Sequence, residues 1–497
     1  TQADLEIDVD AKGLDASGPI VLGGIAGDLK WRENFSTKGV AFRSRYDLKV
    51  PDISEDQRKL LRLEGPPFVA PFMTGPVAAQ VVATLHGGGK GDIDVKLDLS
   101  SAFMRLPGLG WHKTAGTTGG AEVSVRLDKN ELASIPRFSV VAGDLQTRGG
   151  VSFVDGRPRR VDFAKLSYGG RTDVEGSLTL RPGGGLDIVA KGEQFNAEPV
   201  VGEEEPLPGD PPPLTGVEKH RKKSDLPPLT IQGAVKTVWL SRQGKLTNAS
   251  AQLQRDDREW RQMRLTGNVD GGTSFDFSLR QSAANRRALK VTSDDAGAVL
   301  KAFDSYAHMT SGKLEVNAVY EDDKDGQPLV GTIKVNDYYI VNAPALARLL
   351  TVAALTGILD VLQDQGVGFS TLDAPFVLKD GLLQVRDARA YGAALGITAK
   401  GELDLDAKRM ALEGTVVPAY ALNSVLGDIP LLGWLITGGE KGGGLVAFNY
   451  SMKGPTQDPD VMVNPLSALT PGFLRNLFNI FDDGSETDTR KKAAPQK

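Results

Sequence analysis

Short runs in which apolar and polar residues alternate fill most of this chain, and the segment Phe369–Pro418 carries the pattern most clearly. Within it, Leu383 and Val385 flank one polar residue, as do Leu403 and Leu405. A period of two is typical of strands with one apolar face, and the Asp and Gly residues that close the runs are typical of turns. The segment therefore predicts a β-meander with one wet face and one apolar face.

Runs of the same kind recur along the rest of the chain. They lie at residues 92–99, 121–127, 160–166, 173–180, 185–191, 229–235, 249–254, 263–269, 274–279, 313–320 and 329–335. Asp-Gly pairs at 155, 270, 325 and 380 punctuate them, and Asp-Gly is a strong signal for a tight hairpin. The expected fold class is mainly β: an elongated, repeating β-groove of curled antiparallel sheets with a few amphipathic helices.

Three segments have the apolar spacing of a helix. One runs from Pro344 to Leu362 with Asn342 as its N-cap, and a shorter one covers residues 294–305. The third begins after Thr470, and its apolar side suits docking on a membrane or a membrane-bound partner, or capping the end of a groove. That side consists of Phe473, Leu474, Leu477, Phe478 and Phe481.

The clearest change of composition lies at residues 198–228, which hold eight prolines, an acidic triplet and a basic cluster. Such a composition favours extended chain over a packed core, so we interpret the segment as a linker or a long exposed loop. It separates a β-groove region at 1–197 from a second one at 229–463, and the amphipathic helix with a charged tail occupies 464–497. The first residues have a strand-like pattern and predict neither a signal peptide nor an amino-terminal anchor.

Residue types that carry catalysis or bind metal occur in no familiar arrangement. The 4 histidines lack helical metal spacing, and the chain has no cysteine. The glycines at 87–91 precede a strand-like run, whereas a phosphate-binding loop requires a helix there. The formal net charge of −5 gives no reason to expect nucleic-acid binding. We expect no catalytic residues, no metal and no cofactor.

An apolar strand face must pack against another sheet, a helix layer, a barrel interior or a ligand. The predicted helices are too few to cover so many strands. Two interpretations stay open: a sandwich or solenoid core, and an open curled sheet whose inward residues form a trough for acyl chains. The candidate lining residues are Ile93, Val95, Leu97, Leu99, Val123, Val125, Leu127, Phe275, Phe277, Leu279, Leu314, Val316, Leu403 and Leu405.

Several motifs resemble a known family, the AsmA-like proteins of Gram-negative bacteria, particularly the large YhdP-type members with a DUF3971 region and an AsmA-like carboxy-terminal region. The resemblance rests on FVLKDGLLQVRDARAYGAALGITAKGELDLDAKRMALEGTVVP, on the run that continues from it to residue 478, and on the helix from Pro344. Upstream, LSSAFMRLPGLGWHKTAGTTGG and GGRTDVEGSLTLRPGGGLDIVAKG look like the DUF3971 part.

The resemblance implies a periplasmic protein, anchored to the inner membrane by an amino-terminal segment absent from this chain, that carries phospholipid between the inner and outer membranes and supports outer-membrane lipid homeostasis. Expected partners are phospholipid, the two membranes and envelope proteins. The alternative function is a scaffold or assembly factor for outer-membrane proteins, which would receive strands at exposed sheet edges. A carbohydrate-binding or hydrolytic solenoid would need inward aromatic platforms, whereas apart from Phe275 and Phe277 the candidate inward residues are aliphatic.

Overall fold

The computed structural model describes residues 2–36, 39–202, 226–283, 286–418 and 447–464. It confirms the mainly β class, with 63% of the described residues in strands and 10% in helices. One mixed sheet of 26 strands, not closed into a barrel, is accompanied by a separate sheet of three short strands. Two compact units divide the chain: unit 1 comprises Thr1–Ala307 and Asn317–Lys324, and unit 2 comprises His308–Val316 and Asp325–Lys497.

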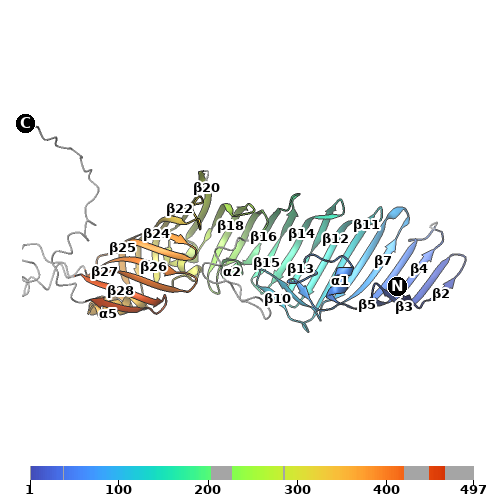
Figure 1. Ribbon diagram of the computed structural model, residues 1–497, viewed down its shortest axis with the longest axis horizontal. Coiled ribbons are helices and arrows are strands. Elements are labelled where there is room, and N and C mark those ends of the chain that lie inside the picture. Colours follow the sequence, from blue (N-terminus) through green and yellow to red (C-terminus); the bar gives the residue numbers. More distant parts are fainter. Residues whose placement is uncertain (1, 37–38, 203–225, 284–285, 419–446, 465–497) are drawn as a thin grey trace, which may run out of the picture. The chain divides into compact units, whose positions relative to one another are not determined.

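Unit 1 contains the longer series of strands, which stand side by side in Figure 1. The bounds are β1 Gln2–Ala3, β2 Glu6–Val9, β3 Gly13–Leu22, β4 Ile25–Asn34, β5 Ser44–Ile53, β7 Val77–Leu85, β8 Gly91–Asp98, β11 Gly119–Asp128, β12 Glu131–Ala142, β13 Leu145–Val154, β14 Arg157–Tyr168, β15 Thr172–Leu180, β16 Leu186–Asn196, β17 Leu229–Trp239, β18 Lys245–Arg255, β19 Trp260–Asn268, β20 Ser274–Ala283 and β21 Arg286–Ser293. Strand β22 (Met309–Glu321) contributes residues to both units.

Antiparallel pairing of successive strands builds almost the whole series, as the alternating pattern predicts. Tight turns make it possible. Strands β13 and β14 are joined by Asp155 and Gly156, whose φ angles of 51° and 70° suit a two-residue hairpin turn. In unit 2, Asp380 and Gly381 have φ angles of 50° and 78° between β24 (Val367–Lys379) and β25 (Leu382–Tyr391). These two predicted Asp-Gly turns are confirmed.

One pair of strands is parallel, and the Pro-rich segment connects it. Strand β16 pairs with β17 in parallel over its whole length, from Leu186 with Leu229 to Asn196 with Trp239. Backbone hydrogen bonding therefore joins the strands on either side of the Pro-rich segment, and both strands belong to unit 1. Within the segment, the structure describes helix α2 (Glu198–Val201) and residues 226–228; residues 203–225 lie outside the described chain.

Unit 1 also has short elements beside its main strands. They are α1 Glu55–Leu60, β6 Met73–Thr74, β9 Phe103–Leu106, β10 Trp111–Lys113, α4 Ala296–Ala302, and the 3-10 turns η1 Gly87–Gly89 and η2 Asp270–Gly272. Strand β9 pairs with both β6 and β10 and forms the three-stranded sheet. Helix α4 matches the helix predicted at 294–305, and the Asp295 carboxylate caps it by accepting from the Ala298 amide at 2.8 Å.

In unit 2, β22 is followed by β23 Leu329–Ile340, β24, β25, β26 Leu395–Asp404, β27 Arg409–Pro418, β28 Phe448–Pro455 and β29 Asp460–Asn464. The predicted meander from Phe369 to Pro418 is confirmed as four antiparallel strands, β24 to β27.

The prediction of one continuous helix from Pro344 to Leu362 is wrong. The chain forms α5 Pro344–Val352 and α6 Thr356–Gln363, separated by a turn in which Ala354 has a φ of 58°. Asn342 is not the N-cap, because Ala343 occupies that position and no side chain caps the helix. The turn lets the two short helices pack on each other while α5 contacts β29 and α6 contacts β24.

Candidate functional site

The pairing of neighbouring strands aligns apolar residues in an unbroken row across unit 1. In strands β4 to β21, each member of the row is the direct partner of the next, so all of these side chains lie on one face of the sheet. We call this the central row: Leu29, Leu48, Val81, Val95, Val123, Phe138, Gly149, Phe163, Gly176, Ala190, Gly233, Ala251, Leu265, Phe277 and Val291. No polar side chain interrupts it.

Two further rows flank the central row on the same face. The first lies toward the strand ends at which a turn joins β14 to β15. Its members are Val50, Ala79, Leu97, Ala121, Val140, Thr147, Leu166, Val174, Gly192, Val235 and Ala249. The second lies toward the opposite strand ends: Ile135, Val151, Val161, Leu178, Ile188, Ile231, Leu253, Met263, Leu279 and Leu289. Thr147 is the single polar member, and its hydroxyl donates to the Lys165 carbonyl at 3.0 Å.

The opposite face of the same strands is charged. Lys96 and Glu122, the neighbours of Val95 and Val123, are partners in register and form an ion pair at 3.3 Å. A second pair joins Lys191 to Glu175 at 3.0 Å. A concavity of about 670 Å³ on this sheet is lined in part by those two residues. The strands are therefore one-sided, with water on the charged face and an apolar face that needs another neighbour.

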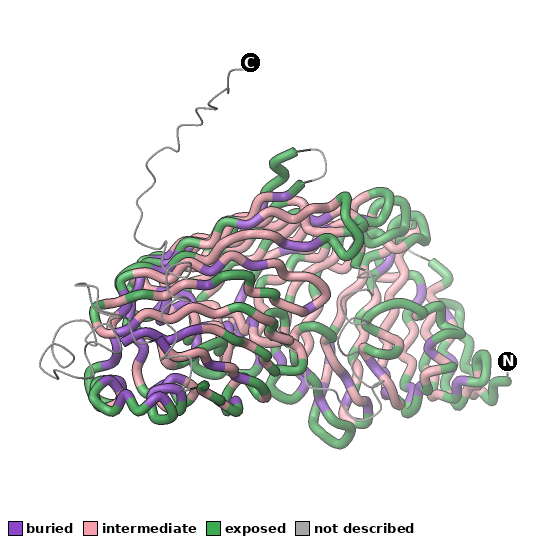
Figure 2. The backbone as a smooth tube through the Cα atoms, turned by 60° about the vertical axis from the view of Figure 1, so that its left-hand side comes forward, coloured by how far each residue is buried: buried purple, intermediate pink, exposed green. Residues whose placement is uncertain are grey.

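The middle of the apolar face has no cover among the described residues. Every central-row residue that has a side chain is half-buried, and none belongs to the buried core. Figure 2 shows this intermediate exposure along the middle of the strands, with exposed residues at the turns. In a two-layer fold the central positions of a sheet are the most buried, because a second layer packs on them. This sheet has the opposite distribution.

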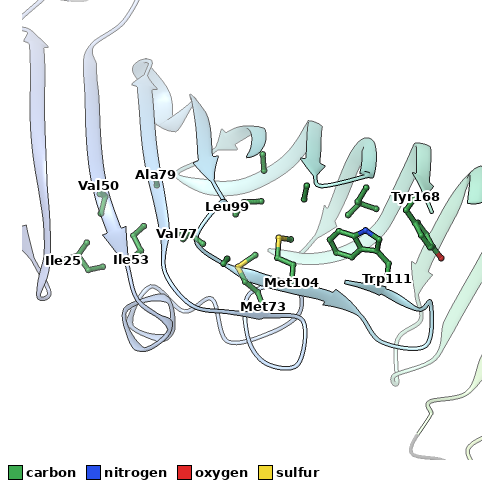
Figure 3. Close-up of a cluster of buried hydrophobic side chains, with 14 residues drawn as sticks. Ile25, Val50, Ile53, Met73, Val77, Ala79, Leu99, Met104, Trp111 and Tyr168 are labelled. Atoms are coloured by element: carbon green, nitrogen blue, oxygen red, sulfur yellow. The ribbon is translucent and has the colours of Figure 1, made fainter. Parts of the chain in front are cut away.

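One edge of the apolar face is closed. A buried cluster follows the strand ends there: Ile25, Val50, Ile53, Met73, Val77, Ala79, Leu99, Ala102, Met104, Trp111, Ala121, Ala142, Leu145 and Tyr168. Figure 3 shows Met73, Met104 and Trp111, from the three-stranded sheet, near Val77 of the large sheet and Leu99, which follows β8. We call this side the covered edge. It includes the connections at 54–76 and 99–118.

Buried cations hold the backbone of the cover together. The Arg58 guanidinium, 1% exposed, donates to the carbonyls of Phe68 at 2.9 Å and Gly75 at 2.7 Å. The Lys113 ammonium, also buried, donates to the Ala102 carbonyl at 2.8 Å, and burial lowers the pKa of Lys113. Both cations are held by neutral carbonyl groups, so their role is to satisfy backbone carbonyls inside the cover and hold its loops in place.

Two aromatic residues complete this attachment. Trp111 donates from its indole nitrogen to the Asp144 carboxylate at 2.8 Å, and the same carboxylate accepts from the Gly169 amide at 2.8 Å. The Tyr168 hydroxyl donates to the Leu109 carbonyl at 3.1 Å, and burial raises its pKa. The cover is therefore bound to the turns of the large sheet by side chains as well as by apolar contact.

The candidate lining residues divide between the open rows and the closed edge. Val95, Val123 and Phe277 belong to the central row, Leu97 and Leu279 belong to the flanking rows, and Ile93 pairs with Val125. Leu127 pairs with Leu132 next to a turn. Leu99, 2% exposed, lies in the covered cluster, and Phe275 lies under α4, with its ring 5.8 Å from that of Phe303.

The remaining candidates lie in β22 and unit 2. Leu314 is buried and Val316 half-buried, two positions apart in β22. Leu403 continues a row with Leu383 and Met410, whereas Leu405 follows the end of β26 and is 49% exposed. The proposed docking residues Phe473, Leu474, Leu477, Phe478 and Phe481 lie outside the described residues.

Sequence reasoning missed the first part of the central row and the cover. Leu29 and Val81 lie in strands whose alternation is masked by Gly and Ala, whereas Leu48 alternates with Tyr46 and Val50 and carried a readable signal. Helix α1 had a recognisable signal: Ser54 and Gln57 form a capping box, in which each side chain accepts from the other's backbone amide. Strands β9 and β10 have four and three residues, too few for a period to be read.

A charged cluster ends the apolar face of unit 1 at its opposite edge, near β18 to β22. Arg287, 5% exposed, forms two parallel hydrogen bonds with the Asp322 carboxylate, at 2.7 and 2.9 Å, and an ion pair with Glu259 at 2.8 Å. Burial alone would raise the pKa of Asp256, but hydrogen bonds from the Glu259 and Arg258 amides and from Arg261 lower it to about 2. These ion pairs balance the buried charges of the cluster.

In the part of the chain that the structure describes, no group of three or more His, Asp or Glu residues is placed to hold a metal ion. Among the same residues, the helices are too short or too polar to cross a membrane. Comparison with known protein families, curated proteins and solved structures finds no match to this chain.

Proposed function

We propose that this protein shields the acyl chains of phospholipids on the apolar face of unit 1 and so supports their movement between the inner and outer membranes. The observation that carries the proposal is the central row, which is apolar without interruption over fourteen successive pairings and only half-buried throughout. A face of that kind in water is costly, and a lipid tail covering it recovers roughly 25 cal/mol for each Å² removed from water.

The mechanism makes and breaks no bond. The rows replace the bilayer interior as the environment of the tails, and side chains such as Val95, Val123 and Leu265 contact them without directional bonds. Because successive strands offer equivalent apolar surface, a lipid displaced by one strand spacing, about 4.8 Å, meets similar contacts. Motion along the row therefore has small free-energy steps. The resemblance to AsmA-like proteins supports phospholipid as the cargo and the periplasm as the location.

A scaffold for outer-membrane proteins is the second candidate function. Strand β2 supports it, because β2 pairs with β3 on one side and its residues Ile7 and Val9 are 56% and 57% exposed. An edge strand with apolar side chains can receive a strand from another protein. Under this alternative, the binding partner is polypeptide at β2, and the central row stays empty of lipid.

Photo-crosslinking at adjacent residues distinguishes the two. A benzophenone side chain placed at position 95 or 123 faces the apolar side, and one placed at 96 or 122 faces the charged side of the same strands. After incubation of the full chain with phospholipid vesicles, we expect lipid adducts at 95 and 123 and few at 96 and 122. Equal labelling at all four positions, or none at any, would contradict lipid shielding.

A further inference from the structure

The two edges of the apolar face in strands β7 to β16 differ in construction. At the covered edge, residues from outside the large sheet pack on the strand ends, including Met73, Met104 and Trp111. At the other edge, the strands are joined by the short connections 86–90, 129–130, 155–156 and 181–185. We call this the turn edge. It has no counterpart of the cover among the described residues of these strands.

Exposure follows that difference. The apolar residues that end the strands at the turn edge are half-buried and none belongs to the buried cluster: Leu85, Leu127, Leu132, Phe153, Leu180 and Leu186. At the covered edge, Leu99, Ala142 and Leu145 are 2%, 0% and 4% exposed. An acyl chain lying along the strands therefore ends against a closed apolar wall on one side and reaches water on the other.

Cations lie at the rim of the turn edge. Lys90 and Lys129 are exposed on two of its turns, Arg157 is exposed as the first residue after a third, and none has an ion-pair partner within the described chain. The turns also carry acidic residues, such as Asp128 and Asp155. Neighbouring turns touch, since the Asn130 amide donates to the Gly89 carbonyl at 2.8 Å. The rim thus offers cationic donors for a phosphate group beside carboxylates that suit an ammonium group.

The covered edge differs, because the cation beside its buried cluster is already hydrogen-bonded. Its buried cation Lys113 is held by the carbonyls of Ala102, Thr114 and Ser100, at 2.8, 3.1 and 3.3 Å. The cluster around it is apolar and includes Met73 and Met104, whose flexible side chains adapt to different neighbours. A charged headgroup at this edge would lose its hydration without replacement, which costs several kcal/mol.

The distance between the edges suits a lipid tail. From Gly91 at the turn edge to Leu99 at the covered edge, the chain advances eight residues, or about 26 Å at ~3.3 Å per residue. One leaflet contributes about half of the ~30 Å hydrocarbon thickness of a bilayer. A tail of that length fits along the strand direction with its carbonyl end near the rim.

We propose that strands β7 to β16 hold phospholipid in a single orientation, with the phosphate at the turn edge beside Lys90, Lys129 and Arg157 and the terminal methyl groups directed toward Met73 and Met104. This inference rests on the proposed function and adds the polarity of the bound lipid. Lipids in successive positions are then parallel to one another, and their headgroups follow the line of turns.

Positional photolabelling tests the orientation on the unmodified chain. Two phospholipids are used in vesicles, one with a diazirine in the headgroup and one with a diazirine at the end of an acyl chain, and labelled peptides are mapped by mass spectrometry. The headgroup probe should label 86–90, 129–131 and 155–157, and the tail probe should label the segments around Met73 and Met104. Reversed labelling, or the same distribution for both probes, would overturn the orientation while leaving lipid binding intact. Absence of both probes from the apolar face would overturn the proposed function as well.

Charge reversal at the rim gives a second test. In the triple variant Lys90→Glu, Lys129→Glu, Arg157→Glu, we expect retention of phosphatidylglycerol by the purified chain to fall severalfold. The matched control Lys30→Glu, Lys49→Glu, Arg126→Glu changes the net charge equally with three exposed residues on the charged face, and it should retain lipid like the natural chain. Equal loss in the two variants would assign the effect to net charge and overturn the role of the rim.

Discussion

Units 1 and 2 are built from the same alternating strands, yet they treat their apolar faces differently. In unit 2, helix α5 packs on β29 and α6 on β24, and Leu349, Leu350 and Leu362 are fully buried, as are Val367 and Leu395 of the strands. In unit 1 the cover follows one edge, and the central row is only half-buried. The comparison teaches that alternation specifies an apolar face, whereas the segments between strands decide whether that face becomes a core.

The largest contrast is expected from leucine truncation in the two units. Leu350→Ala removes a fully buried side chain of unit 2 and should lower the free energy of unfolding by about 2–5 kcal/mol. Leu265→Ala in the central row removes a half-buried side chain, so we expect about 1 kcal/mol. Urea denaturation followed by hydrogen exchange in each unit measures both. Equal losses would mean that the central row is packed as tightly as the helix-covered core.

The cover should depend on its buried cations. Lys113→Met removes three hydrogen bonds to backbone carbonyls, and leaving such acceptors unpaired costs about 1–3 kcal/mol. We expect faster amide exchange in β9 and β10 and little change in β17 to β21. Lys59→Met, at an exposed lysine of α1, is the control. If exchange in β9 and β10 is the same in both variants, the Lys113 anchor is not what holds the cover.

A smaller effect concerns pH at the charged end of unit 1. The folded pKa of Asp256, about 2, lies below the ~3.9 of an unfolded aspartate, so its contribution to stability is present above pH ~4 and is lost as the pH falls toward 2. Asp256→Asn should flatten the dependence of unfolding free energy on pH in that range. An unchanged slope would show that other carboxylates dominate acid unfolding.

The sequence predicted the strands well because their period of two and their Asp-Gly turns are local signals, as at Asp155 and Asp380. The prediction of one continuous helix failed at Ala354, where the chain forms a turn that the apolar spacing does not reveal. The closed edge was missed, because it depends on contacts such as Trp111 with Asp144 and Lys113 with Ala102, between segments that carry no periodic pattern. Consequently Leu99 and Phe275, which alternate like Val95 and Phe277, could not be recognised as covered positions.

Native mass spectrometry of the purified full chain tests the central claim most directly. The account predicts that phospholipid copurifies with the natural chain and that the double variant Val95→Asp, Val123→Asp, which places two carboxylates in the central row, loses most of it while circular dichroism stays unchanged. The control Lys96→Asp on the charged face should retain its lipid. A natural chain free of lipid, or a folded double variant that binds as much as the natural chain, would contradict the account.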